Sequence, residues 1–267
     1  MRKIHHFFLS LNIFVSSLAV CQPDLAKIRV EAGKDDRENI ILSASLDGLE
    51  VDIANSSIQL YEQVKRGEVA VSSELLTENG LKLYWKLNGL LKAGSSKTYI
   101  VRKLSKTPIG TESTLTIRKD GGNLVVMNDK HIVLKYNLYP VFPPTGISEL
   151  FQRAGFIHPL YSPSGEVDFW NLYKGEGTVR PSSIISATAN SIYAGFKVLH
   201  DHIDLNGKTP EGFEIVLKEV WDVKVWNMGA ESWLIDLVST FNNISDSTLL
   251  LKEYRYQGFG FRATEKW

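Results

Sequence analysis

The sequence lacks most features that mark redox, nucleic-acid-binding or membrane-spanning proteins. Its 267 residues include one cysteine, Cys21, so no intrachain disulfide framework can form. Basic and acidic residues number 30 each, and this balance removes the usual electrostatic argument for binding nucleic acid. No segment after the N-terminus is apolar over the roughly 20 residues that a transmembrane helix needs. We therefore expect no nucleic-acid partner and no transmembrane segment.

Motifs for several common chemistries are also missing from the sequence. It contains no nucleophile elbow, no P-loop, no dinucleotide-binding fingerprint and no His-Glu-x-x-His zinc motif. We accordingly predict neither a cofactor nor a metal site. Nothing in the sequence specifies an oligomeric state.

The first 21 residues have the pattern of a secretory signal peptide. Arg2 and Lys3 supply positive charge, and the following stretch, Phe7–Val20, is almost free of charge. A buried N-terminal strand or helix is the alternative. We expect cleavage near Cys21, which would leave a mature chain without cysteine, and we favour this over a lipoprotein anchor because Val20 is bulky for a lipobox. The predicted location is the periplasm or the cell surface.

The rest of the chain is predicted to be all-β, in two domains. Short strands separated by turns over 24–105 suggest a small immunoglobulin-like sandwich. Ser105–Gly110 combines Pro and Gly without periodicity and is the predicted linker. Residues 112–267 are predicted to form a larger antiparallel β-sandwich. Its predicted strands are Thr114–Arg118, Leu124–Met127, His131–Tyr136, Tyr193–Ile203, Phe213–Trp226, Trp233–Phe241 and Leu249–Tyr256.

Glu219 is the most informative single residue. In a strand it shares one face with apolar residues on both sides, from Phe213 to Val225. An ionised carboxylate on such a face is costly unless it is paired or hydrogen-bonded. The pattern therefore predicts either that Glu219 lines a pocket or that it forms a structural ion pair with a buried arginine.

A second candidate is the pair His200 and His202. Residues two apart in a strand share a face, so both imidazoles are expected to point the same way. Such a pair can supply half of a metal site, but no third ligand with recognisable spacing follows or precedes it. The alternative is two histidines at the end of a strand.

Polar and aromatic residues also gather in a turn-rich segment, Arg153–Gly165, which contains His158 and Tyr161. Such groups on a proline-fixed loop make good ligand contacts, although the same composition can build a rigid corner. The aromatic-rich second region would also suit sugar rings, but tryptophan is ordinary core material in β-sandwiches.

Four motifs together resemble the PmoA-like family of unknown function, whose members are exported proteins common in bacteria that degrade polysaccharides. The motifs, in chain order, are Arg153–Gly165, Val167–Asn171, Trp233–Asp236 and Gly258–Arg262. The resemblance covers about Glu112 to Trp267. It places seven residues at motif positions: His158, Tyr161, Asp168, Trp170, His202, Glu219 and Arg262. It does not include His200.

The sequence departs from this family pattern in two places. The family has a His-rich stretch where Glu166 here runs directly into Val167, and its pattern continues beyond the Gly-Phe-Arg motif. One interpretation is therefore an inactive, truncated fragment.

The resemblance implies a sugar-handling sandwich of the galactose-mutarotase type. Two functions are open for such a sandwich. In a carbohydrate-active enzyme, His158 and Glu219 would serve as acid and base. Arg262 would orient the ligand, with Tyr161, Trp170, Asp168 and His202 also contacting it. In a non-catalytic carbohydrate-binding or structural module, the aromatic residues would supply most of the binding surface.

Overall fold

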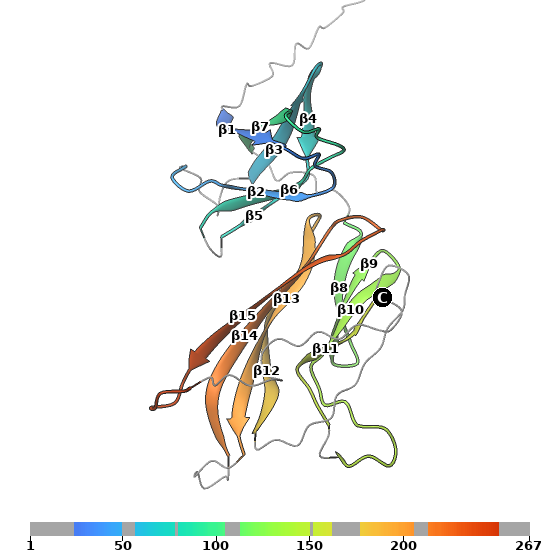
Figure 1. Cartoon of the computed structure of the whole chain (residues 1–267), viewed down its shortest axis with the longest axis vertical. Coiled ribbons are helices and arrows are strands. Elements are labelled where there is room, and N and C mark those ends of the chain that lie inside the picture. Colours follow the sequence, from blue (N-terminus) through green and yellow to red (C-terminus); the bar gives the residue numbers. More distant parts are fainter. Residues whose placement is uncertain are drawn as a thin grey trace, which may run out of the picture.

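The computed structural model describes residues 24–49, 57–77, 80–104, 113–149, 152–161, 177–205 and 213–250 (Figure 1). The regular elements in these ranges are β-strands, paired antiparallel in four sheets. The predicted all-β class is confirmed. The predicted signal peptide and the Ser105–Gly110 linker lie outside the described residues, as does nearly all of the predicted strand Leu249–Tyr256.

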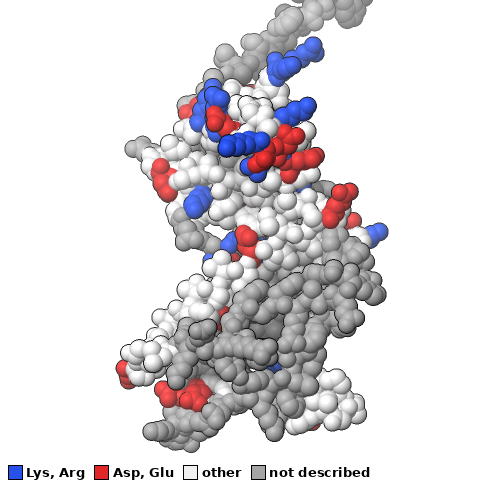
Figure 2. Space-filling model, viewed as in Figure 1, with Lys and Arg blue, Asp and Glu red and all other residues white. Residues whose placement is uncertain are grey.

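The N-terminal part is a sandwich of a four-stranded and a three-stranded sheet. The larger sheet has the order β1-β7-β3-β4, and the smaller has the order β2-β6-β5. The bounds are β1 Asp24–Glu31, β2 Ile41–Ser45, β3 Ser57–Val64, β4 Gly67–Val71, β5 Ser73–Leu76, β6 Lys82–Lys86 and β7 Ser96–Leu104. Trp85 of β6 and Tyr99 of β7 are fully buried between the sheets, with Leu60 and Val101. Basic and acidic side chains intermix on the face of this sandwich seen in Figure 2.

The third sheet has the order β11-β10-β9-β8. Its strands are β8 Leu115–Asp120, β9 Asn123–Asn128, β10 His131–Asn137 and β11 Phe156–Leu160. Gly121 and Gly122 join β8 to β9 with φ angles of 53° and 83°. Two successive positive φ angles are what a two-residue type I′ hairpin turn requires, and they join the predicted strands Thr114–Arg118 and Leu124–Met127 as a hairpin.

The fourth sheet has the order β12-β13-β14-β15 and the longest strands of the molecule. They are β12 Gly177–Ala189, β13 Tyr193–Asp204, β14 Glu214–Trp226 and β15 Leu234–Asn243. Among the described strands, β12 and β15 form its two edges. β12 is largely exposed, contains Pro181 and has two irregularities in its pairing with β13. Proline is tolerated at such an edge because its missing N–H is not needed by a second neighbour.

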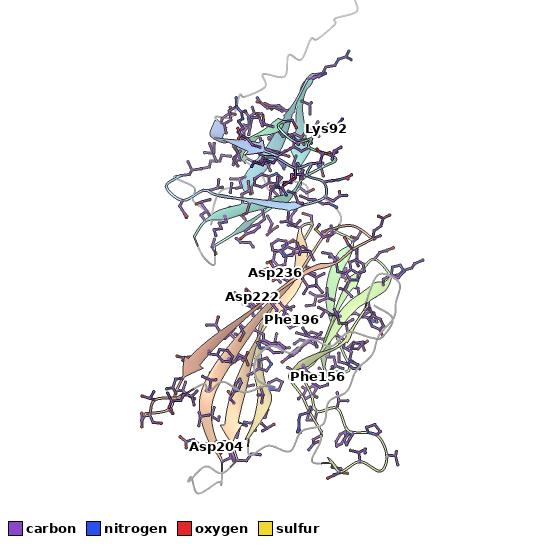
Figure 3. All side chains as sticks on the ribbon, in the orientation of Figure 1. Lys92, Phe156, Phe196, Asp204, Asp222 and Asp236 are labelled. Atoms are coloured by element: carbon purple, nitrogen blue, oxygen red, sulfur yellow. The ribbon has the colours of Figure 1, made fainter. Side chains whose placement is uncertain are left out.

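The third and fourth sheets face each other across a common apolar core. Leu124, Val126 and Leu134 come from the third sheet, and Phe196 and Val223 come from the fourth. Phe196 lies between the two sheets in Figure 3, and its ring is 5.1 Å from that of Tyr136. The alternation of β13 and β14 therefore places one side of each strand in this core and the other side outside it.

A smaller aromatic cluster joins the two sandwiches. Trp226 at the end of β14 stacks on Tyr84 of β6, with ring centroids 5.4 Å apart, and also contacts Tyr193. The side chain of Asn128 donates to the carbonyl of Gly229 nearby. No helix in the described ranges is long and apolar enough to cross a membrane.

Candidate functional site

The site is centred on Glu219, on the core-facing side of β14. In the β13–β14 register, Glu219 is paired directly with His200 and lies diagonally across from His202. On the other side, Glu219 is paired with Phe241 of β15. The predicted shared face of Glu219, Trp221 and Val223 is therefore present, and both histidines lie on the neighbouring strand.

Three donors converge on the Glu219 carboxylate. His202 Nε2 donates to Oε2 at 2.7 Å, while Trp221 Nε1 and Ser239 Oγ both donate to Oε1 at 2.5 Å. Glu219 is 6% exposed. The carboxylate is thus buried and hydrogen-bonded, as its position on an apolar strand face predicts, but its basic partner among the described residues is a histidine and not an arginine.

The environment keeps Glu219 ionised. Burial by itself would raise its pKa, but the hydrogen bonds from His202, Ser239 and Trp221 outweigh that effect and lower the pKa to about 2. Because an ionised carboxylate only accepts hydrogen bonds, His202 must carry a proton on Nε2. The bond therefore fixes the tautomer of a neutral His202 and leaves Nδ1 as its second functional nitrogen.

His200 has a different role, deep in the core. It is completely buried, and its Nε2 lies 2.6 Å from the hydroxyl of Tyr136 on the facing sheet. Its ring packs edge-on against Trp221. Gly155 leaves room for this ring, because a Cβ there would come within 3.0 Å of it. Burial lowers the pKa of His200, so this imidazole is neutral at physiological pH.

His202 is the accessible member of the cluster. Its side chain is 26% exposed, compared with 8% for that of Glu219. The ring of Phe241 lies 5.9 Å from the His202 ring in an edge-on arrangement, and Phe241 itself is 51% exposed. We call these residues the Glu219 cluster: Tyr136, His200, His202, Glu219, Trp221, Ser239 and Phe241. Its accessible side presents an imidazole beside an apolar ring.

The structure brings together only some of the residues predicted for the site. His202 and Glu219 are in contact, whereas His158 lies on β11 with its ring 6.3 Å from that of Phe156. No contact between His158 and Glu219 is found among the described residues. Tyr161 follows β11, where its backbone N–H donates to Val133. Three further predicted residues lie outside the described residues: Asp168, Trp170 and Arg262.

Sequence reasoning did not assign Tyr136, Trp221 or Ser239 to the site. Trp221 carries a detectable signal, since it is two residues from Glu219 on the same face. Tyr136 belongs to another sheet, and Ser239 belongs to β15, so their proximity depends on pairing that the sequence does not specify.

His200 and His202 do share a face, as predicted, but each has its own protein partner. Their Nε2 atoms contact Tyr136 and Glu219 respectively. Among the described residues, no group of three or more His, Cys, Asp or Glu side chains is placed to hold a metal ion.

Residues 166–267 match the model of a family of unknown function (DUF6807). The match includes β12–β15 and therefore His202 and Glu219, while Tyr136 and His158 precede it. No curated protein and no solved structure matches the chain. Nothing in this match links that family to the PmoA-like family, so the resemblance to the latter stays a prediction.

Proposed function

We propose that this is an exported, carbohydrate-active protein that uses the Glu219 cluster to act on a sugar in polysaccharide breakdown. One observation carries the proposal: a buried, ionised carboxylate holds a half-buried histidine beside an exposed aromatic ring. An imidazole oriented by a carboxylate can exchange a proton with a sugar hydroxyl. The ring of Phe241 offers an apolar surface to the C–H face of the same sugar.

In this proposal, His202 exchanges the proton with the sugar hydroxyl, and Glu219 holds the His202 ring in its orientation. A carboxylate with a pKa of about 2 is a weak base near neutral pH, whereas a histidine is suited to gain and lose a proton there. His158, predicted to act as acid with Glu219 as base, can take that role only if ligand binding brings it to the cluster. Export and the galactose-mutarotase type of sandwich are part of the same proposal.

The test combines a glycan array with polarimetry on freshly dissolved galactose and glucose, using the full mature chain. We expect wild-type protein to bind glycans and to accelerate interconversion of the anomers. His202→Gln should lose the acceleration while remaining folded by circular dichroism. The matched control is His131→Gln, because His131 is exposed at the start of β10.

Three outcomes separate the possibilities. Glycan binding that depends on His202 without any acceleration would favour a non-catalytic carbohydrate-binding module. Absence of both binding and acceleration would refute a carbohydrate function at this site. Equal losses in His131→Gln and His202→Gln would also count against it, since the effect would then be unspecific.

A further inference from the structure

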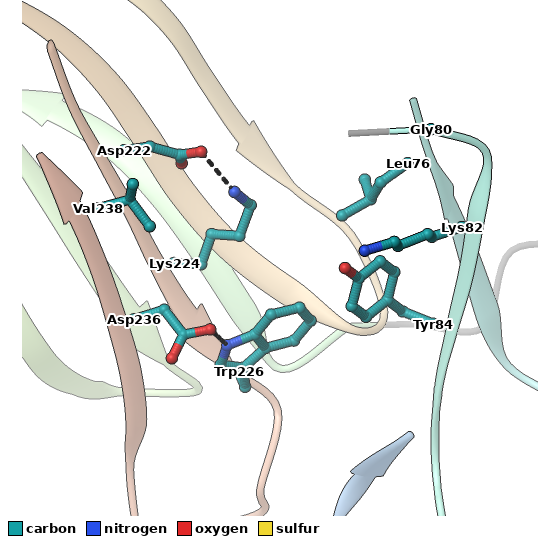
Figure 4. Close-up of a pocket in the computed structure, with 9 residues that line it drawn as sticks. All are labelled: Leu76, Gly80, Lys82, Tyr84, Asp222, Lys224, Trp226, Asp236 and Val238. Carbon is teal, nitrogen blue, oxygen red and sulfur yellow. Dashed lines mark hydrogen bonds and ion pairs between the residues drawn. The ribbon is translucent and has the colours of Figure 1, made fainter. Parts of the chain in front are cut away.

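A polar cleft lies between the two sandwiches, on the side of β14 opposite the Glu219 cluster. Figure 4 shows its lining, which comes from β5 and β6 on one side and from β14 and β15 on the other. Its volume is about 190 Å³.

Strand alternation explains why this cleft is separate from the Glu219 cluster. Glu219 and Trp221 point to the core side of β14, whereas Asp222 and Lys224 point to the other side. In Figure 3, Asp222 and Asp236 lie on the side of the sheet away from Phe196. The two sites therefore share a sheet but not a face.

The floor of the cleft is aromatic and fixed. Trp226 stacks on Tyr84, and its indole N–H donates to Asp236 Oδ2 at 2.8 Å. Trp226 is 5% exposed, so its ring is held by packing as well as by this bond. The aromatic contact joins the two walls and positions the polar groups above it.

The walls offer both donors and acceptors. Lys224 Nζ donates to Asp222 Oδ2 at 2.6 Å, and Lys197 Nζ lies 3.3 Å from the same oxygen. A carboxylate has about four acceptor positions, so Asp222 and Asp236 both keep accepting capacity. Lys82 points into the cleft in Figure 4, and its positive charge also helps to lower the pKa of the Asp47 carboxyl.

The lining charges balance: Lys224, Asp222 and Asp236 lie on one wall, and Lys82 lies on the other. A ligand that fits this cleft must therefore donate and accept hydrogen bonds without needing a net charge. The volume is below the roughly 300–1,000 Å³ of sites for drug-sized ligands, which indicates a small ring. Hydroxyl groups meet both requirements, because each can donate to a carboxylate and accept from an ammonium group.

We propose that this cleft binds one neutral sugar ring, with its hydroxyls shared between Lys82, Asp222 and Asp236. The site goes beyond the proposed function, because it lies on the other face of the sheet and does not involve Glu219 or His202. A sugar bound there would contact both sandwiches at once. Sugar binding would therefore stabilise the junction between the two sandwiches.

The experiment measures sugar binding in the His202→Gln background, which isolates the cleft from the Glu219 cluster. Glucose, galactose and xylose are the probes, with glucuronate and inorganic phosphate as charged comparators. Isothermal titration calorimetry measures the affinity for each sugar, and saturation-transfer NMR shows whether the sugar contacts the protein. Lys82→Ala and Asp236→Asn are the test variants, and Lys119→Ala is the charge-matched control because Lys119 is exposed on β8.

We expect a neutral sugar to bind, and each test variant to weaken it by roughly tenfold or more, as loss of a charged hydrogen bond does. Lys119→Ala should bind like its parent. The proposal is overturned if no neutral sugar binds, if both test variants bind unchanged, or if glucuronate or phosphate binds better. None of these results affects the His202 experiment, so the two proposals fail separately.

Discussion

Glu219 is a buried acid whose hydrogen-bonding neighbours are all donors. Its carboxylate accepts three hydrogen bonds and donates none, which favours the ionised form, so its negative charge is part of the folded structure. In Glu219→Gln the amide oxygen can still accept from Trp221 and Ser239, as Oε1 does now, but the amide NH2 then takes the place of Oε2 and faces the N–H of His202, donor against donor. The stability of the fold should consequently depend on the ionisation of this residue.

Glu219→Gln should lower the free energy of unfolding at pH 7 by about 1–3 kcal/mol, the usual cost of leaving buried donors poorly satisfied. The folded pKa of about 2 lies below the ordinary value of 4.5, so the stabilisation is present above pH 4.5. It is lost as the pH falls from 4.5 towards 2. Urea unfolding of both proteins across this range should show their difference shrinking.

The control for this prediction is Glu214→Gln, an exposed position on the same strand. Its free energy of unfolding should follow that of the wild type at every pH. A difference between wild type and Glu219→Gln that stays constant down to pH 2 would contradict the ionisation argument.

Much of this site was predictable from sequence, because period-two alternation alone places Glu219 on an apolar face. The hydrogen-bonding partners of Glu219 could not be predicted from the sequence. His202 and Ser239 lie on different strands. To predict either contact, the register of an antiparallel strand pair must be known to within one residue. Tyr136 is further removed, since it reaches His200 from the facing sheet.

At the scale of elements, the β8–β9 hairpin shows how local sequence determines structure. Gly122 has a φ of 83°, a conformation that costs other residues energy. Gly122→Ala should therefore lower the free energy of unfolding by about 1 kcal/mol or more, measured by thermal or urea denaturation.

Gly121→Asn is the matched comparison for the hairpin. Gly121 has a φ of 53°, and asparagine adopts this region readily at the first position of a type I′ turn. This variant should be nearly as stable as the wild type. A Cβ at Gly121 meets nothing within 4 Å, whereas one at Gly122 would also press on the Tyr139 ring, so equal destabilisation by both variants would contradict this prediction.

Two elements of the C-terminal sandwich, β11 and β12, escaped prediction for physical reasons. β12 contains Pro181 and alternates poorly, because most of its side chains are exposed and few are selected for burial. β11 lies in a segment dense in turn-forming residues, yet Ile157 and Leu160 pack on the core and pair with β10. In both strands, tertiary pairing overrides a weak local preference.

At the scale of the whole molecule, two separate cores meet at a small aromatic junction. Limited proteolysis should cut first within Ser105–Gly110, the segment predicted to link the sandwiches, and leave a resistant N-terminal fragment. Mass spectrometry of a trypsin time course would locate this cut. A single protected unit at every protease dose would contradict the two-domain prediction, which stays open until then.

β12, an edge strand among those that the structure describes, has a consequence for how copies of this protein behave at high concentration. An open strand edge can template the addition of another chain and begin aggregation. Along β12, Pro181 removes one donor, and the two pairing irregularities between 181 and 186 interrupt the regular spacing of the others. A second copy would therefore find no continuous ladder to extend, so the same irregular strand favours solubility.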